Sequence, residues 1–586
     1  MAKSRKGRRE NRRPFSVEAG PPPSSQCDPC APGGADAPVP SADSQREPRA
    51  DLRPAAPSGA PSPEPRWRRA LPASAPALLL AAVLLIPFAG KAFTIDDTLF
   101  MRQAEWALSD PLHPSALTMV WSEVPRPMRL SQVMPTGPLM AWLLMPAALA
   151  GGSEVVAHLL QLLLLGIAIL EVAVLALRMG YDESVARLSA LFLAATPAVL
   201  GMAGTAMPDV AAMTFGLVGI ERLYAWRQER GAAAGVMAAL CLGLAPLART
   251  HLLLLPAVAV CVLEYPWRRD AWRQWVPVVA APAITMAIVL LTRDPLGGSA
   301  DMARSAGFFS SLANVRSNAV AFGVHWVMLL PLGLAWMVTR GRRFWLSPVP
   351  WLGMAAAASA LANDTRWLWI APVAGLGIAV VADVVLDGWR EQSADRVALG
   401  LWLLLALPIV VYLHFPSKYL VACAPAAAIV AAAAVLELPK RGAMAVGAGP
   451  VAGGALFGTL ILQADATFAG LGKRAVEELV VPRVAAGERV WFNAHWGFQW
   501  YAERAGASIV TSTAPLPRPG DLLVSARVTI AGIPVQAFRK RELLATVSDD
   551  AAGGRILSSE LGAGFYSNGW GYLPWVWGST EVDRFE

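Results

Sequence analysis

The feature that most constrains this chain is a long series of apolar segments, the first of which covers residues 71–90. A helix needs about 20 apolar residues to cross the hydrocarbon core of a bilayer, and it satisfies its backbone polar groups internally. The chain is 55% hydrophobic and 16% charged, whereas soluble domains are about 25% charged. The sequence therefore predicts a polytopic α-helical membrane protein.

The first 68 residues are rich in Pro, Ala, Ser and Arg and show no apolar periodicity. Such a segment buries too little apolar surface to offset the entropy lost on folding, so we expect residues 1–68 to be a disordered, basic and Pro-rich cytoplasmic tail. The basic flank "RWRRA" before the first apolar segment predicts that the N-terminus stays inside. The formal net charge of +7 does not indicate a nucleic-acid partner, because the arginines stand in short clusters between apolar runs.

One short apolar segment decides the predicted orientation of the rest. The stretch "PTGPLMAWLLMPAALAGG" offers about 16 apolar positions interrupted by prolines, which is short for a spanning helix. If it lies in the outer interface, the clusters "WRRDAWR", "RGRR", "DGWREQSADR" and "LPKR" all fall on the cytoplasmic side, as the positive-inside tendency demands. We therefore predict about 13 spanning helices, which places the C-terminus outside. The predicted spans cover residues 71–90, 155–177, 186–204, 210–226, 232–248, 251–265, 275–292, 319–338, 347–362, 367–386, 397–414, 419–437 and 443–462.

The composition becomes that of a soluble domain from about residue 463. There "AGERVWFN" and "GDLLVS" have the pattern of short strands, and "WGFQWYAERAGA" has that of a helix ending at Gly506. Beyond the tail, we therefore expect a transmembrane domain over residues 69–462 and a small extracytoplasmic α/β domain over residues 463–586. Four side chains in that domain suit either sugar recognition or an ordinary core, and we favour the core: Asn493, His495, Trp496 and Gln499.

Several charged residues remain at the outer ends of the predicted spans. Two aspartates begin the first loop in "TIDDTLF", a third sits in "TAMPDV", and cations stand in "LARTHLLLLP" and "SKYLVACAP". A charge at the centre of a spanning helix costs about 2.5–3.5 kcal/mol, and less near the interface. For any one of these residues, a role as a helix cap or an interfacial side chain is as good an explanation as a functional role. For the group as a whole, that explanation is less satisfactory. Its members are Asp96, Asp97, Asp209, Arg249 and Lys418.

Five segments in this order resemble the membrane glycosyltransferases of the GT-C class: "IDDTLF…AEWAL", "PTGPLMAWLL", "TPAVLGMAGTAMPDV", "LARTHLLLLP" and "SKYLVACAP". The chain is most similar to bacterial members of family 39, which are related to protein O-mannosyltransferases and to the aminoarabinose transferase of lipid A. The resemblance covers residues 75–440. It implies a GT-C fold in a multi-pass protein of the bacterial cytoplasmic membrane. It also implies transfer of a hexose or pentose from a polyprenyl-phosphate donor to a hydroxyl of a lipid, glycan or protein of the cell envelope.

The resemblance also assigns residues. The acidic motif of the family's first loop corresponds to Asp96 and Asp97, and the aspartate of its second loop to Asp209. A hydroxyl that attacks an anomeric carbon needs a carboxylate to accept its proton, which contributes about 10²–10⁴ in rate; we prefer Asp96 for this role and Asp97 next. The leaving phosphate gains negative charge, which Arg249 and Lys418 can stabilise. Contacts to the acceptor or the sugar are predicted for His113, His251 and Tyr419.

Two positions depart from the family pattern. Relatives often carry Lys, His or Asn followed by two prolines in the first loop, where this chain has Thr136, Gly137 and Pro138, so a cation or metal ligand is missing. Relatives often have Thr-Lys after the fifth span, where this chain has Arg249 and Thr250. The positive charge is kept, but the compact ammonium of lysine is replaced by the planar guanidinium of arginine. No cofactor is predicted firmly, and a divalent metal stays open. Its candidate ligands are Asp96, Asp97, His113 and Asp209.

Two other functions stay open. A transporter or flippase for a lipid-linked saccharide would need charges in mid-membrane and paired halves with broken helices, whereas the charges here are peripheral and no repeat is evident. A catalytically silent envelope protein descended from the family is the third alternative, because the first-loop segment is altered.

Overall fold

The structure is a computed structural model, and it describes residues 65–121, 124–133, 137–261, 263, 271–297, 314–513, 515–529 and 540–586. The predicted disordered tail lies outside the described residues up to residue 64, and residues 66–68 begin the first helix. The described residues belong to one compact unit.

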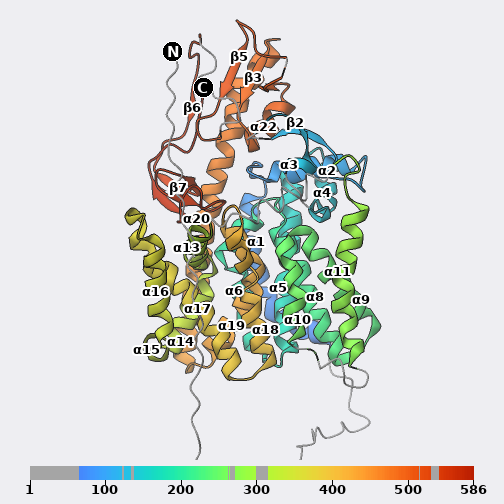
Figure 1. Cartoon of the computed structure of the whole chain (residues 1–586), viewed down its shortest axis with the longest axis vertical. Helices are drawn as coiled ribbons and strands as arrows, with labels where there is room; N and C mark the ends of the chain where they lie inside the picture. The colour runs from blue at the N-terminus through green and yellow to red at the C-terminus, as the bar shows by residue number, and fades with distance from the viewer. Residues whose placement is uncertain are drawn as a thin grey trace, which may run out of the picture. The chain divides into compact units, whose positions relative to one another are not determined.

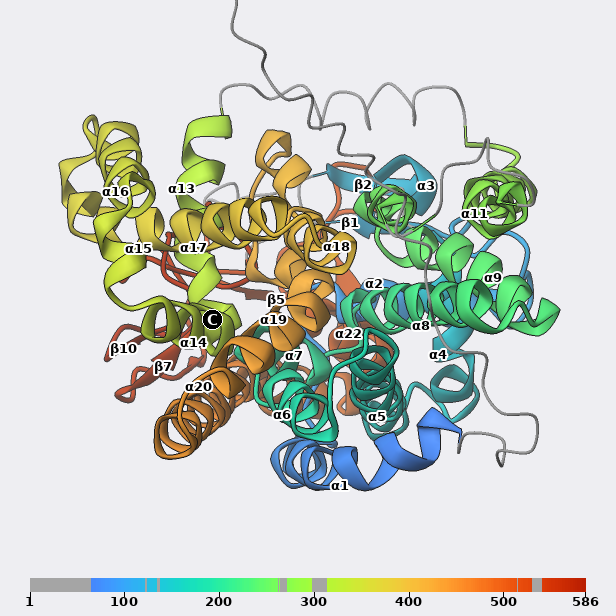
Figure 2. The ribbon, with the colours of Figure 1, turned by 90° about the horizontal axis from the view of Figure 1, so that it is seen from below.

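Most of the described chain is a bundle of helices that run in roughly the same direction (Figure 1). Seen along that direction, the helices pack around one another rather than in a flat layer (Figure 2). The α-helices of the bundle are α1 (Arg66–Leu85), α5 (Glu154–Arg178), α6 (Glu183–Ala194), α7 (Pro197–Ala203), α8 (Asp209–Glu229), α9 (Ala232–Ala248), α10 (Leu255–Val260), α11 (Trp272–Leu291), α13 (Val315–His325), α14 (Leu330–Arg340), α15 (Arg342–Leu346), α16 (Pro348–Leu361), α17 (Ala371–Arg390), α18 (Ala394–Leu403), α19 (Ala424–Leu436) and α20 (Lys440–Ala475). Short 3₁₀ segments continue or join them: η1 (Ile86–Phe88), η2 (Thr250–Leu254), η4 (Trp326–Leu329), η5 (Thr365–Ile370), η6 (Leu407–Val411) and η7 (Ser417–Cys423).

Among the described residues, eight helices are long and apolar enough to cross a membrane, or nine if the bent pair α6 and α7 is one span. This confirms a polytopic helical membrane protein, but the predicted count of 13 spans is too high by this measure. Three predicted spans correspond to the shorter apolar helices α9, α10 with η2, and α16. A fourth corresponds to α8, which is not among the candidate spans and carries Asp209, Glu221, Arg222, Arg227 and Glu229.

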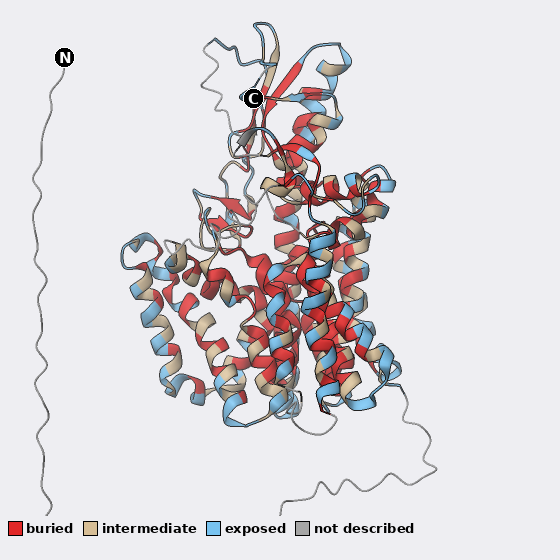
Figure 3. Cartoon of the chain, turned by 45° about the vertical axis from the view of Figure 1, so that its right-hand side comes forward, coloured by how far each residue is buried: buried red, intermediate tan, exposed pale blue. Residues whose placement is uncertain are grey.

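Local sequence signals explain how several helices begin. Ser153 caps α5 by accepting a hydrogen bond from the amide of Val156, and Asp182 caps α6 by accepting from two amides of its first turn. Pro197 is the first residue of α7, and because proline cannot continue a preceding helix, α6 and α7 are bent by 55°. Buried residues gather where the helices face one another, and exposed residues follow their outward sides (Figure 3), as expected for helices that face lipid.

The first loop, residues 89–153, contains small elements at one end of the bundle (Figure 1). They are α2 (Asp97–Ala107), β1 (Thr118–Trp121), β2 (Val124–Arg129), α3 (Leu130–Val133) and α4 (Leu139–Leu149). Strands β1 and β2 pair antiparallel, with Thr118 opposite Arg129. Helix α4 has 11 residues, fewer than the about 20 that a span requires. This length agrees with the prediction that "PTGPLMAWLLMPAALAGG" does not cross the membrane.

Helix α20 links the bundle to the C-terminal region. It has 36 residues and so extends about 54 Å, well beyond a hydrocarbon core of about 30 Å. The predicted division between residues 462 and 463 falls within this helix and stays a prediction. The elements that follow are η8 (Val476–Val480), α21 (Val481–Ala485), β3 (Val490–Asn493), α22 (Trp496–Arg504), β4 (Ser508–Ile509), β5 (Leu522–Ser525), β6 (Val547–Ser548), β7 (Gly553–Arg555), β8 (Leu557–Ser558), β9 (Ala563–Gly564), β10 (Val576–Gly578) and β11 (Arg584–Phe585).

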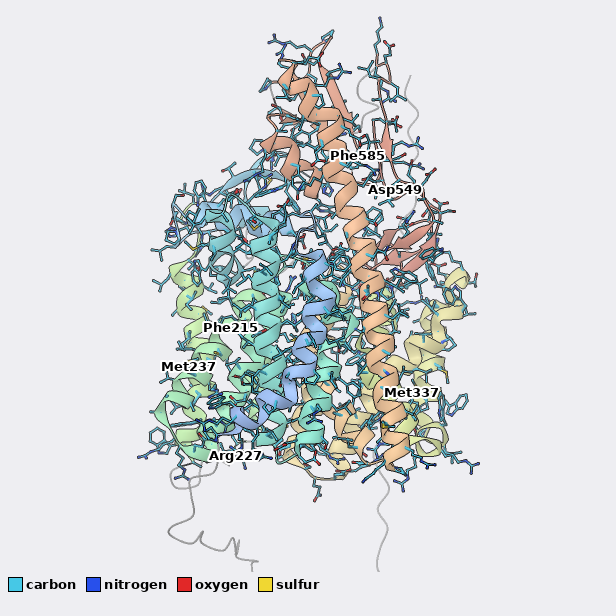
Figure 4. All side chains as sticks on the ribbon, turned by 180° about the vertical axis from the view of Figure 1, so that it is seen from behind. Phe215, Arg227, Met237, Met337, Asp549 and Phe585 are labelled. Atoms are coloured by element: carbon cyan, nitrogen blue, oxygen red, sulfur yellow. The ribbon has the colours of Figure 1, made fainter. Side chains whose placement is uncertain are left out.

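The C-terminal region contains a three-stranded sheet in the order β4-β3-β5. Both pairings are parallel, with Trp491 opposite Ser508 on one side and opposite Leu523 on the other. Helix α22 connects β3 to β4, which is the crossover that parallel strands require. The two strands and the helix predicted from the sequence are confirmed. Asp549 and Phe585 of this region lie at the end of the molecule opposite Arg227 of α8 (Figure 4).

Candidate functional site

Asp96 lies in the turn that leads from η1 into α2. The preceding residue, Ile95, has a φ of 48°, in the left-handed region that costs a branched side chain about 1–3 kcal/mol. Asp96 occupies the N-cap position of α2, but its side chain makes no capping hydrogen bond. Its Oδ2 instead accepts a hydrogen bond from Nζ of Lys418 at 2.8 Å. The carboxylate is therefore directed toward η7 and is not used as a helix cap.

Asp209 and Arg249 form a second ion pair. Asp209 begins α8, and Arg249 follows the last residue of α9 in an extended conformation. The guanidinium donates through Nε to Oδ1 at 2.8 Å and through Nη2 to Oδ2 at 2.6 Å. This two-pronged geometry uses the planar fork of arginine, which a lysine at the same position would not reproduce.

Tyr419 joins the two ion pairs. It follows Lys418 in η7, and its ring centroid lies 5.3 Å from Cζ of Arg249, within cation–π range. The ring of His251 meets Tyr419 edge-on, with centroids 5.4 Å apart. Five of the eight predicted site residues therefore come together with Asp96: Asp209, Arg249, His251, Lys418 and Tyr419.

The two ion pairs are unequally exposed. The side chains of Lys418 and Asp209 are only 6% and 2% exposed, whereas those of Asp96 and Arg249 retain 15% and 14%. Asp96 and Arg249 are thus the more exposed members of the two ion pairs.

The charges around Asp96 determine its protonation. Burial acts to raise the pKa of its carboxyl, but the charge of Lys418, the hydrogen bond from Lys418 and the charge of Arg249 together outweigh burial and hold the pKa below its usual value. Burial and the adjacent Lys418 in turn lower the pKa of His414 to about 4. At neutral pH, Asp96 is therefore ionised and His414 is neutral.

Asp97 has different surroundings. Its side chain is fully buried, and it accepts hydrogen bonds from the amides of Thr94 at 3.2 Å and Ala206 at 2.8 Å. Ala206 lies three residues before Asp209, so Asp97 ties the first loop to the segment that carries the second acidic motif. Burial raises the pKa of Asp97 to about 7, with Lys91 opposing and Asp465 adding to the rise. These contacts favour a positioning role over proton transfer.

His113 lies away from this group. It follows α2, and its Nδ1 is 3.0 Å from the carboxylate of Asp110. Within the described parts of the chain, no group of three or more His, Cys, Asp or Glu side chains is arranged to hold a metal ion. The candidate metal set that combined His113 with the three aspartates is therefore not assembled in the structure.

The altered first-loop segment packs directly against the site. Thr136 is outside the described residues, but Gly137 lies against the end of α9, where an added Cβ would be 1.9 Å from the carbonyl oxygen of Leu247. Leu247 is two residues before Arg249. Gly137 is therefore required by the close approach of its backbone to that of Leu247.

The C-terminal region holds the turn that carries Asp96. The backbone amide of Phe93 donates to the hydroxyl of Tyr501 in α22 at 2.8 Å. Gly497, at the start of α22, lies so close that an added Cβ would be 2.3 Å from the carbonyl oxygen of Phe93. Nε2 of Gln499 donates to the carbonyl of Val120 at 2.9 Å. Gln499, predicted as part of a local core, therefore contacts the first loop.

A buried network behind Asp97 was not predicted. Lys91 forms an ion pair with Asp465 of α20, and the hydroxyl of Tyr566 donates to the same aspartate at 2.9 Å. Asp465 is the one acidic residue of α20 and stands three residues beyond the predicted span 443–462, which was a sequence signal for a role at the end of the bundle. His414 was missed as well, although it stands four residues before Lys418 in "HFPSK".

No protein-family model matches this chain, and no curated protein matches it. Solved structures with a similar arrangement include the archaeal oligosaccharyltransferase AglB from Archaeoglobus fulgidus in complex with an inhibitory peptide and a dolichol-phosphate. That match has 12% identity and a TM-score of 0.45, and it covers 75% of this chain and 64% of AglB. This chain thus spans less than two thirds of that protein.

ArnT from Cupriavidus metallidurans, bound to undecaprenyl phosphate, is similar with 15% identity and a TM-score of 0.44, over 78% of this chain and 92% of ArnT. The apo state of ArnT is similar with 16% identity and a TM-score of 0.38, over 74% of this chain and 84% of ArnT. Similarity at this level does not identify corresponding residues.

Proposed function

We propose that this chain is a GT-C membrane glycosyltransferase that moves a sugar from a polyprenyl-phosphate donor to a hydroxyl acceptor at the outer face of the bacterial cytoplasmic membrane. One observation carries the proposal. The side chains of Asp96 and Arg249 are both partly exposed at one end of a helix bundle, and each is paired with a more buried partner of opposite charge. A proton acceptor beside a phosphate ligand is what the transfer needs.

The reaction uses these groups as follows. The acceptor hydroxyl gives its proton to the Asp96 carboxylate while its oxygen attacks the anomeric carbon of the donor. The bond between that carbon and the phosphate oxygen breaks, and its electron pair leaves on the phosphate. Arg249 and Lys418 stabilise the charge that develops there, which is a contribution larger in the transition state than in the ground state.

The ion pair between Asp96 and Lys418 couples donor binding to proton transfer. An ionised carboxylate whose pKa is held low by Lys418 is a weak base. A donor phosphate that draws the ammonium of Lys418 toward itself removes part of that stabilisation, so the pKa of Asp96 rises in the complex. The base is thereby strengthened when the donor is in place.

The position of the site suits a donor dissolved in the bilayer. The predicted donor keeps its polyprenyl chain among the lipids and presents its phosphate at the membrane surface, near Asp96 of the first loop and Lys418 at the start of the candidate span Ser417–Leu436. The acceptor approaches from the extramembrane side, next to α22. We assign the acceptor contacts to His251 and Tyr419, and we place the transferase domain at residues 69–462 and an extracytoplasmic domain at 463–586.

The experiment that tests this proposal measures the fate of the donor. Full-length protein in proteoliposomes is given undecaprenyl phosphate carrying a labelled hexose or pentose, together with an envelope fraction from a strain that lacks the gene. We expect labelled sugar to appear on an acceptor and undecaprenyl phosphate to be released.

The two alternatives predict other results. A transporter or flippase would move the label to the opposite leaflet with the sugar–phosphate bond intact, detected by periodate added on one side. A silent scaffold would bind undecaprenyl phosphate without cleavage or movement across the membrane. Either result with both sugar classes contradicts the proposal.

A further inference from the structure

A second candidate site lies at the opposite end of the bundle from Asp96. There a cavity of about 230 Å³ opens among the ends of α14, α17, α18 and α19. These helix ends and α15 meet at the end of the bundle that faces away from the C-terminal strands (Figures 1 and 2). The cavity is lined by four arginines, two carboxylates and several small or apolar side chains.

Two of the four arginines are fixed by neighbouring groups. Arg340 forms an ion pair with Asp387, and its Cζ lies 4.4 Å from the ring centroid of Trp336. Arg396 pairs with Glu391 at 2.6 Å and with Glu437 at 3.3 Å. These two guanidinium groups have their charges largely balanced and form a rigid wall of the cavity.

The other two arginines are brought to the cavity by a turn. Gly341 has φ 48° and ψ −127°, a conformation in which a side chain is strained, and it reverses the chain between α14 and α15. Arg342 and Arg343 follow it and line the cavity. In the part of the chain that the structure describes, neither has a carboxylate within 4.0 Å. The cavity therefore has an excess of positive charge.

The surroundings of the cavity are those of a membrane surface. Trp345 and Leu346 of α15 and Trp351 of α16 are exposed, and all three lie within eight residues after Arg343 in the sequence. Exposed tryptophan is enriched where hydrocarbon meets head groups. Basic pockets between helices at that depth bind the head groups of anionic lipids.

We propose that this cavity binds the phosphate group of an anionic membrane phospholipid, with Arg342 and Arg343 as its principal ligands. Arg340 and Arg396 provide the preorganised wall, and the acyl chains lie along the apolar surface of α15 and α16. The phosphate fits the charge of the cavity, and the exposed tryptophans favour a lipid over a soluble phosphate compound. The site is independent of the transfer reaction, because it lies at the other end of the bundle.

The test measures lipid binding to the purified full-length protein by native mass spectrometry and by thermal shift. Phosphatidylglycerol is compared with phosphatidylcholine and with inorganic phosphate. We expect phosphatidylglycerol to bind preferentially, and the double variant Arg342→Gln/Arg343→Gln to bind it about 20- to 30-fold more weakly. Arg390→Gln is the matched control, because Arg390 is an exposed arginine near the end of α17 that does not line the cavity.

Four outcomes decide the proposal. Equal binding of phosphatidylglycerol and phosphatidylcholine, or an equal loss in Arg390→Gln, would overturn it. Displacement of phosphatidylglycerol by inorganic phosphate at similar concentration would show that the cavity binds a soluble phosphate compound. That result would overturn the proposal of a lipid ligand. Recovery of most of the affinity in Arg342→Lys/Arg343→Lys, which keeps both charges, would support it.

Discussion

Nζ of Lys418 lies 2.8 Å from Oδ2 of Asp96, although 322 positions separate the two residues in the sequence. The contact brings together the first loop and the 3₁₀ segment η7, and it places the acid that we propose as the base beside a cation that we propose as a phosphate ligand. Because Lys418 is nearly buried, this ion pair also fixes the position of Asp96 before any substrate binds.

The first prediction concerns the fork geometry of Arg249. Arg249→Lys keeps the charge but loses the two-pronged hydrogen bonds to Asp209. We expect kcat to fall by about 10- to 100-fold and KM for the donor to rise, since phosphate charge is present in the ground state and grows in the transition state. Steady-state kinetics with varied donor measures both. Arg366→Lys, at an exposed arginine that pairs with Asp364, should change neither; normal kinetics for Arg249→Lys would remove Arg249 from the site.

The second prediction concerns the contact of α22 with the first loop. In Gly497→Ala, the new methyl group would be 2.3 Å from the carbonyl oxygen of Phe93, so the turn that carries Asp96 must shift. A shift of about 1 Å can cost about 100-fold in rate. We expect transfer to fall by at least about tenfold, with donor binding retained.

Gly470→Ala is the control for that measurement. Gly470 lies within α20 and an added Cβ there has no neighbour within 4 Å, so the helix should be unchanged or slightly stabilised. Equal turnover in the two alanine variants would show that α22 does not position Asp96.

The third prediction concerns Asp97 and pH. Burial raises its pKa to about 7 in the folded protein, so its contribution to stability is complete below its unfolded pKa and is lost as the pH rises through about 7. Asp97→Asn cannot ionise and lacks this dependence. Relative to the natural chain, the variant should therefore gain stability as the pH rises from about 4 to about 7, by at most about 1.4 kcal/mol per pH unit, and the difference should level off above about pH 7. Thermal unfolding of both proteins across that range measures the difference, and a constant difference would contradict the assignment.

The fourth prediction concerns orientation. Asp550→Cys introduces a thiol at an exposed position of the C-terminal region, while Cys27 and Cys30 lie in the predicted cytoplasmic tail. An impermeant maleimide added to intact cells should label position 550 and not the tail, and both should react after permeabilisation. Peptide mapping by mass spectrometry identifies the labelled sites. Labelling of the tail alone in intact cells would reverse the proposed orientation.

Local patterns in the sequence were sufficient to predict several elements. The lengths of the apolar runs predicted a polytopic helical protein. Short strand-like patterns predicted β3 and β5, and a helical pattern that ends at a glycine predicted α22. Length alone did not determine how many helices span the membrane, because α9 and α16 are apolar but short.

The site was predicted only in part for a similar reason. Asp96, Asp209, Arg249 and Lys418 each stood out as a charge beside an apolar run, but their pairing depends on tertiary contacts that no local pattern contains. Gly137 and Gly497 were not recognised as supports, because the need for glycine arises from a backbone segment distant in sequence. His113 was assigned by its place in the first loop, and the structure pairs it with Asp110 instead.

The most direct test of the account replaces Asp96 by asparagine, which keeps the shape of the side chain but cannot accept the proton. We expect Asp96→Asn to accumulate in the membrane and to bind undecaprenyl phosphate, while transfer from the labelled donor falls by about 100-fold or more. Asp110→Asn is the matched control, because Asp110 is an aspartate of the same loop that pairs with His113, and its transfer rate should be normal. Near-normal transfer by Asp96→Asn, at equal protein abundance, would contradict the assignment of Asp96 as the base.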